Sequence, residues 1–306
     1  MKKPRLIALL GALLALLLVE LAGHQFAAAL HFRSRRFTNT QDRDLGVACS
    51  PDSTAKPGAP IDLLAVGDAY TDGTPGLGPK EMYPQLAAES LHKNVVNLGC
   101  GEYGTVQEEL VADEWLRRET PKWLVLEVYP GNDWLDNYDY SQWRRARANI
   151  PYELYRGLVK DGMDGAGALD RLHSRLVGRS FLYTVAFDGW RKRHPREDWR
   201  RAEPGAARIG EDQAFAAVGR LQSLCARKHV KFVVLLVRIK SALDEASSNY
   251  VPVREFLAKN RIAFVDPYAE FALAENKGQE LFLPSGHWNA AGQKIAADLI
   301  ARKLRE

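Results

Sequence analysis

The sequence predicts an α/β domain built on a parallel sheet. Short apolar runs alternate along the chain with segments whose apolar residues recur at helical spacing, from Ile61 to the C-terminus. Strands that alternate with helices of about ten to fifteen residues form βαβ units with right-handed crossovers. The composition, 46% hydrophobic and 26% charged, is typical of a globular protein rather than a disordered one.

Five strands and five helices are expected, in alternation. A strand that is buried on both faces appears as a continuous apolar run. The runs at 61–66, 95–98, 123–128, 230–237 and 263–265 fit this pattern. Helical spacing covers 81–91, 105–118, 214–228, 253–259 and 289–304. Asn289 is the expected N-cap of the last helix.

The first thirty residues have the pattern of a targeting segment. A basic start, Met1–Arg5, precedes an apolar stretch from Leu6 to Leu30 that only Glu20 interrupts with a charge. About 20 apolar residues cross a bilayer. We therefore expect residues 1–31 to be a signal anchor that binds the membrane through a transmembrane helix over residues 6–30.

A cleaved signal peptide is the alternative, with Ala27–Ala29 at the cleavage site. Both alternatives export the domain to the periplasmic or extracellular side, and the basic start favours an N-terminus inside. Residues 32–60 are polar and lack periodicity, so a linker is expected there.

The domain is expected over residues 61–306, with a mostly helical insertion at about 133–210 that breaks the alternation. This insertion contains the basic run Arg191–Arg196, followed by Arg200 and Arg201. Such a run can contact anionic headgroups or an acidic polymer, or form the solvated face of a helix and loop.

Composition excludes several classes of function. A net charge of +4 is too balanced to indicate nucleic-acid binding. The three cysteines, Cys49, Cys100 and Cys225, lack CxxC spacing, so neither a disulfide framework nor a particular pairing is predicted. The seven histidines are dispersed, and no metal site is expected.

Four loops carry the residues of chemical interest, three of them at strand ends and one before the last helix. They read Gly-Asp-Ala-Tyr-Thr-Asp-Gly at 67–73, Asn-Leu-Gly-Cys-Gly-Glu-Tyr-Gly-Thr at 97–105, Pro-Gly-Asn-Asp at 130–133, and Gly-His-Trp-Asn-Ala-Ala-Gly at 286–292. The carboxyl ends of parallel strands are where such sheets bind ligands.

In order and location, these loops resemble the blocks of the SGNH (GDSL-type) hydrolase family, over residues 61–132 and 211–304. The resemblance implies a flavodoxin-like three-layer sandwich and ester chemistry without a cofactor. In the family, a serine in the first block attacks the ester and a histidine in the last block takes its proton. An aspartate shortly before the histidine orients it. Backbone and asparagine N–H groups stabilise the oxyanion.

Only some of these roles can be assigned to matching residues of this sequence. His287 matches the base and Asn132 the oxyanion asparagine. The nucleophile position holds Ala69, and the oxyanion glycine aligns with Glu102, or with Gly101 if the loop slips by one residue. Pro284 and Ser285 occupy the places of the missing aspartate.

Further residues are expected to line the ligand pocket: Asp68, Tyr70, Thr71, Cys100 and Trp288. Cys100 is also a candidate substitute nucleophile, with a small buried residue as its alternative. Asp68 and Thr71 have alternative structural roles in the turn.

The leading hypothesis is an exported, membrane-anchored SGNH-like protein that binds an acyl or carbohydrate ligand, or a partner, without efficient turnover. The alternative is an active ester hydrolase or O-acyltransferase of the cell envelope. A structural module in a membrane assembly is the third hypothesis. Whether the chain is an enzyme is left open, and no protein partner is predicted.

Overall fold

The computed structural model describes residues 11–23, 44–46, 49, 52–54, 59–73, 76–146, 152, 155–156, 172–173, 176, 180–193, 205–240 and 250–306. The chain divides into two compact units. The sheet unit comprises Ala48–Gln142 and Gly205–Glu306, and the insertion unit comprises Met1–Val47 and Trp143–Pro204.

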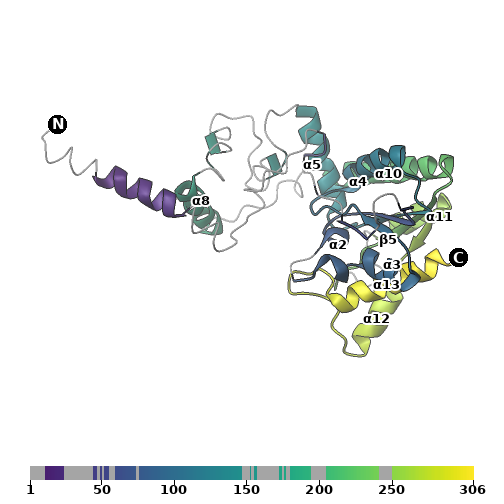
Figure 1. Cartoon of the computed structure of the whole chain (residues 1–306). Coiled ribbons are helices and arrows are strands. Elements are labelled where there is room, and N and C mark those ends of the chain that lie inside the picture. The colour runs from purple at the N-terminus through teal and green to yellow at the C-terminus, as the bar shows by residue number, and fades with distance from the viewer. Residues whose placement is uncertain are drawn as a thin grey trace, which may run out of the picture. The chain divides into compact units, whose positions relative to one another are not determined.

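A six-stranded sheet forms the centre of the sheet unit (Figure 1). Its strands are β1 (Asp52–Ser53), β2 (Leu63–Val66), β3 (Val95–Asn97), β4 (Trp123–Val128), β5 (Lys231–Leu236) and β6 (Ala263–Val265). Their order is β1-β3-β2-β4-β5-β6. All neighbours are parallel except β1, which pairs antiparallel with β3. The order reverses between β2 and β4, which is the kind of switch point where doubly wound sheets bind ligands.

Side chains alternate between the two faces of the sheet and bury both. On β4, Leu124 and Leu126 belong to one core and Val125 to the other. On β5, Val234 faces the first core and Val233 the second. Because both faces are covered, these strands are apolar without interruption, which is the pattern that made them recognisable in the sequence.

Helices cover both faces and complete three layers (Figure 1). The first core contains side chains of α4 (Thr105–Arg118), α10 (Ala206–Arg227) and α11 (Tyr250–Lys259). The second core contains side chains of α3 (Tyr83–Leu91), α12 (Tyr268–Asn276) and α13 (Ala290–Leu304). The remaining elements are α2 (Ala69–Asp72), the 3₁₀ turn η2 (Pro79–Glu81), α5 (Asp133–Ala146) and α8 (Phe181–Arg193).

The predicted α/β class with a mostly parallel sheet is confirmed. Each expected strand is present with slightly different ends, and Asn289 caps α13 by accepting from the N–H groups of Ala291 and Gly292. Four elements of the sheet unit were not expected: the short helices α2 and η2, α12, and β1, which lies inside the segment expected to be a linker. A two-residue strand has no periodicity to detect, and β1 exists through its pairing with β3.

In the insertion unit, residues 11–23 form a helix. Among the residues that the structure describes, no helix is long and apolar enough to cross a membrane. The other parts of the expected anchor, 1–10 and 24–31, lie outside the described residues. The expected insertion at about 133–210 includes α5, α8 and the start of α10. The basic run after Arg193 lies outside the described residues.

Candidate functional site

A pocket of about 610 Å³ opens at the carboxyl ends of the strands, where the strand order reverses. Its lining residues come from five loops: Asp68, Ala69, Tyr70, Glu102, Tyr129, Asn132, Ile239, Lys240, Ser285, Gly286 and His287. The four loops that the sequence singled out therefore meet in one place, together with the loop after β5.

The first loop turns directly from β2 into α2. The Asp68 carboxylate caps this helix by accepting from the Tyr70 N–H at 2.8 Å, and Ala69 follows as its first residue. A Cβ at Gly67 would overlap the side chains of Thr71 and Glu127, so only glycine permits this tight turn. The turn presents the methyl group of Ala69 to the pocket, at the nucleophile position of the resemblance.

The second loop presents Glu102 in a left-handed backbone conformation, with a φ of 79°. The described chain has three other non-glycine residues with positive φ, His92, His229 and Arg261, and each lies just after a helix. Left-handed residues are common at helix ends, whereas Glu102 lines the pocket. Glycine would adopt this conformation without strain.

Gly101, the alternative oxyanion position, does not line the pocket. Its N–H donates to the Asp72 carboxylate at 3.3 Å. This bond uses the N–H group that would otherwise be available to an oxyanion. The geometry therefore favours Glu102 as the residue that corresponds to the expected glycine.

Cys100 forms a disulfide with Cys49, a pairing that the sequence did not predict. Cys49 lies shortly before β1, and the pairing of β1 with β3 brings it to the end of β3, where Cys100 lies. Cys100 is fully buried and does not line the pocket. Its sulfur therefore has no free thiol to act as a nucleophile, and the hypothesis of a substitute cysteine nucleophile is wrong.

The third loop places Asn132 over Asp68. Its Nδ2 donates to the Asp68 carboxylate at 3.4 Å. Its Oδ1 is buried and has no hydrogen-bond partner among the described residues. The amide is thus held at the pocket wall, with a long bond that a ligand can replace.

The last loop presents His287, which has Ser285 beside it. Nδ1 of His287 lies 3.2 Å from Oγ of Ser285, so the contact at Nδ1 is a hydroxyl, where the resemblance leads one to expect a carboxylate. The His287 ring lies 5.0 Å from the ring of Tyr70, and the Tyr70 hydroxyl donates to the Gly286 carbonyl at 3.2 Å. The first and last loops therefore hold each other across the pocket.

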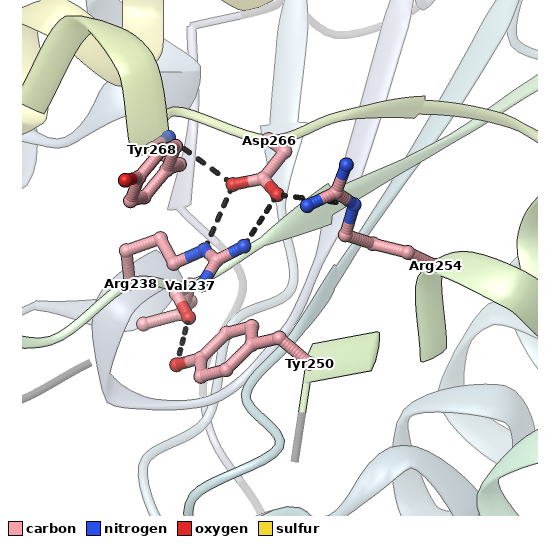
Figure 2. A network of polar contacts seen from close by, with 6 residues as sticks. All are labelled: Val237, Arg238, Tyr250, Arg254, Asp266 and Tyr268. Carbon is pink, nitrogen blue, oxygen red and sulfur yellow. Dashed lines mark hydrogen bonds and ion pairs between the residues drawn. The ribbon is translucent and has the colours of Figure 1, made fainter. Parts of the chain in front are cut away.

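A buried polar network supports the wall formed by Ile239 and Lys240. Figure 2 shows Arg238 facing Asp266, with Tyr250 beside it. The guanidinium of Arg238 donates two bonds to the Asp266 carboxylate, at 2.9 and 2.7 Å. The guanidinium also lies 3.9 Å from the ring centroid of Tyr250. Although arginine is rarely buried, Arg238 has no solvent-exposed surface, and this bidentate pair satisfies it.

A buried carboxyl group, that of Glu127 on β4, lies beneath the first loop. Its Oε2 accepts from the Asp68 N–H at 2.8 Å and from the Thr71 hydroxyl at 3.2 Å. Burial, and after it the charge of Asp68, raises the pKa of Glu127 well above its ordinary value. Sequence reasoning missed Glu127, although a single acid in an otherwise apolar strand was a usable signal.

The structure brings together seven of the residues that the sequence proposed for the site: Asp68, Ala69, Tyr70, Glu102, Asn132, Ser285 and His287. Thr71 and Trp288, proposed for the pocket, are fully buried and do not line it. Sequence reasoning missed Tyr129, Ile239 and Lys240, each of which closely follows a strand. Within the described part of the chain, no cluster of three metal-binding side chains occurs.

Neither a protein-family model nor a curated protein matches the sequence. Solved structures do resemble the chain. A lipolytic protein of the G-D-S-L family from Veillonella parvula is 12% identical with a TM-score of 0.45, covering 79% of this chain and 97% of its own. Axe2, an acetylxylan esterase from Geobacillus stearothermophilus, is 13% identical with a TM-score of 0.47, covering 82% and 96%.

A putative acylhydrolase from Bacteroides fragilis is 13% identical with a TM-score of 0.43, covering 89% of this chain and 96% of its own. The chain is therefore similar in structure to SGNH/GDSL hydrolases and acetylxylan esterases, at low sequence identity. This is a similarity of fold. It assigns neither a family nor an activity to the chain.

Proposed function

We propose that this chain is an exported, membrane-anchored SGNH-like protein whose pocket binds an acylated or carbohydrate ligand, or a partner, without ester turnover. One observation carries the proposal: Ala69 lines the pocket together with His287 and Asn132. A methyl group neither attacks a carbonyl carbon nor supplies a proton to a base. Loss of a triad nucleophile lowers turnover by about 10⁴–10⁶-fold.

The carboxylate of Glu102 also disfavours ester turnover. In an ester hydrolase, this part of the pocket offers hydrogen-bond donors to a developing negative charge. A carboxylate beside that charge repels it. Groups that donate hydrogen bonds, such as sugar hydroxyls, are suited to this position instead.

The remaining lining of the pocket is suited to binding. Its volume of about 610 Å³ lies within the range of about 300–1,000 Å³ that is common for small-molecule sites. The rings of Tyr70 and Tyr129 lie 5.4 Å apart at their centroids and form an aromatic wall. Asn132 and Lys240 add polar groups. Aromatic faces with nearby amide and charged groups accommodate either a sugar ring or an acyl chain with a polar head.

The Cys49–Cys100 disulfide supports export, because disulfides form and persist in oxidising compartments. The apolar leader supplies a route for that export and an anchor afterwards.

The test is hydrolysis of p-nitrophenyl acetate by the full chain in detergent, with Ala69→Ser and His287→Ala measured alongside. We expect no turnover above background from the unchanged chain. A gain in Ala69→Ser would show that the rest of the site supports ester chemistry and that Ala69 alone stops it. Turnover by the unchanged chain that disappears in His287→Ala would overturn the proposal.

Binding is tested separately by thermal shift with two probes, octanoate and an acetylated xylo-oligosaccharide. A rise in Tm with either probe, lost in a Tyr70→Ala variant, supports a ligand pocket of the corresponding class. If neither probe nor any tested acyl compound or glycan shifts the Tm, the pocket is not a site for these ligands.

A specific contact favours a second candidate, an esterase or O-acyl transfer enzyme that uses Ser285. Its hydroxyl lines the pocket and lies 3.2 Å from Nδ1 of His287. Oγ would attack the acyl carbon while its proton passes to His287. The imidazolium would then protonate the departing alkoxide and leave acyl-Ser285. Water or a second hydroxyl would take up the acyl group.

Ser285→Ala distinguishes this candidate from the first. If the unchanged chain hydrolyses p-nitrophenyl acetate and Ser285→Ala abolishes it, the serine takes part in the reaction, either as the nucleophile or by orienting His287. If hydrolysis is present and survives in Ser285→Ala, the candidate is wrong. A covalent adduct with a fluorophosphonate probe, located on Ser285 by mass spectrometry, would provide direct support.

A further inference from the structure

The side chain of Glu20 joins the apolar leader to the insertion by hydrogen bonds. Glu20 is the single charged residue between Leu6 and Leu30. Its Oε1 accepts from the Phe181 N–H at 2.7 Å, and its Oε2 accepts from the Leu182 N–H at 2.9 Å. Oε2 also accepts from the Ser180 hydroxyl at 3.3 Å. Glu20 therefore caps α8 from a position about 160 residues away in the chain.

A glycine one turn later completes the contact. Gly23 lies on the same helix face as Glu20, because residues three apart are neighbours on a helix. A Cβ at Gly23 would overlap the ring of Phe181. At Gly11, in the same helix, a Cβ would meet nothing within 4 Å. Of these two glycines, only Gly23, at the end of the helix that carries Glu20, lies close to Phe181.

The rest of this helix is apolar on every side. The large apolar side chains of residues 11–23 are each about half exposed: Leu13, Leu14, Leu16, Leu17, Leu18, Val19 and Leu21. They do not form a single stripe, as they would on a helix that packs against one protein surface. A helix that is apolar all round is surrounded by apolar material, and the sequence places it in a stretch of membrane-spanning length with basic residues on both sides.

The neighbouring helix has features of a membrane interface. On α8, Val185 and Trp190 are exposed, and tryptophan is enriched at the boundary between lipid and water. In the expected transmembrane helix, Glu20 would lie about 21 Å from Leu6, at about 1.5 Å per residue. It would therefore lie in the outer half of a hydrocarbon core about 30 Å thick, where an unpaired carboxylate is costly. The N-terminus of α8 supplies its partners.

We propose that the leader is retained in the mature protein, and that its Glu20–Gly23 face holds α8 at the outer surface of a lipid bilayer. Cleavage after Ala29 would remove both residues and leave α8 without its cap. This inference rests on the membrane anchor of the proposed function but not on what the pocket binds, so its failure is distinguishable from failure of the pocket to bind a ligand.

Two measurements on the full chain test the contact. Intact mass of the membrane-bound protein should include residues 1–29, and their absence would overturn the proposal. In a Gly23→Cys/Phe181→Cys variant the smaller residue at 181 makes room for the new side chain at 23. We expect a disulfide between the two, identified by mass spectrometry of linked peptides. Gly11→Cys/Phe181→Cys is the matched control and should not link. Failure of the first pair to link, or equal linking in the control, would contradict the contact.

Association of the chain with a bilayer is tested with vesicles of phosphatidylcholine and phosphatidylglycerol. Glu20→Leu, Gly23→Leu and the control Gly11→Leu all add a leucine to the same helix, so all three should float with the vesicles as the unchanged chain does. We expect trypsin to cut at Arg191–Arg193, the end of α8, at least tenfold faster in Glu20→Leu and Gly23→Leu, but not in Gly11→Leu. Equal cleavage in all three, or an unchanged chain that does not float, would overturn the proposal.

Discussion

The indole Nε1 of Trp288 donates a 2.6 Å hydrogen bond to the backbone carbonyl of Arg238. This bond joins the loop that carries His287 to the loop that carries Ile239 and Lys240, on two sides of the pocket. Both partners are fully buried. Since the ion pair with Asp266 fixes Arg238, the position of His287 depends on a charge pair outside the pocket.

The first prediction concerns this ion pair. Arg238→Met leaves the mostly buried Asp266 carboxylate without its main partner, and breaking a buried pair costs about 3–5 kcal/mol. We expect a fall of this size in the free energy of unfolding, measured with urea. Arg238→Met/Asp266→Asn removes the stranded charge and should recover part of the loss. A double variant no more stable than Arg238→Met would contradict the role of the charge.

The second prediction concerns the strain at Glu102. A non-glycine residue at positive φ costs about 1–2 kcal/mol, and glycine recovers part of this at an entropic cost of about 0.5–1 kcal/mol. Glu102→Gly should therefore stabilise the chain by up to about 1 kcal/mol. His92→Gly, at a φ of 52° after α3, should do the same. Both are measured by chemical unfolding.

The two glycine variants should differ in the pocket. In the Ala69→Ser background, Glu102→Gly removes a carboxylate from the expected oxyanion position and should raise p-nitrophenyl acetate hydrolysis about tenfold or more. His92→Gly should leave that rate unchanged. If both variants stabilise the chain but neither affects hydrolysis, Glu102 is strained for a reason other than pocket chemistry.

The third prediction concerns the disulfide. Cys49 and Cys100 are 51 residues apart, and a crosslink that closes a loop of this size stabilises by about 2–5 kcal/mol. Cys49→Ala/Cys100→Ala should lower the Tm accordingly. Dithiothreitol should lower the Tm of the unchanged chain to the same value and leave the double variant unaffected. A reductant effect of equal size on both would point to another cause.

The sequence predicted most of the sheet because its strands are buried on both faces. Leu124 and Val125 face opposite cores, yet both are apolar, so the run is continuous. The same reasoning could not find β1, which depends on a tertiary pairing, or the Cys49–Cys100 bond that depends on the same pairing. α12 was missed because its apolar residues do not recur at helical spacing.

The site was predictable where the loops follow strand ends. Asp68 and Asn132 meet because parallel strands end at one edge of the sheet, whereas His287 lies between α12 and α13 and was found only through the resemblance of its loop. Glu102 could be matched to the expected glycine only by alignment. Its left-handed φ is a property of the folded backbone that the sequence does not show. Sequence reasoning did not identify Arg238 as a structural residue, because nothing in the neighbouring sequence shows that a charged side chain after a strand will be fully buried.

The last prediction concerns pH. Burial first, and then the charge of Asp68, raises the pKa of Glu127 well above its ordinary value of 4.5. Burial first, and then the charge of Asp133, does the same for Glu108. At a pH between the ordinary pKa and the raised one, the carboxyl groups of Glu127 and Glu108 are protonated in the folded chain and ionised in the unfolded chain. Because the folded state then binds more protons, its stability falls as the pH rises.

We therefore expect the free energy of unfolding to be larger near pH 5 than near pH 8. Each such carboxyl contributes a slope of up to about 1.4 kcal/mol per pH unit. Glu127→Gln retains an oxygen for the Asp68 N–H and cannot titrate, so it should flatten the slope by one carboxyl. Glu89→Gln, on the exposed side of α3, is the matched control and should leave the slope as it is. A slope that is flat in the unchanged chain, or that stays the same in Glu127→Gln, would show that Glu127 is not a neutral acid in the folded protein.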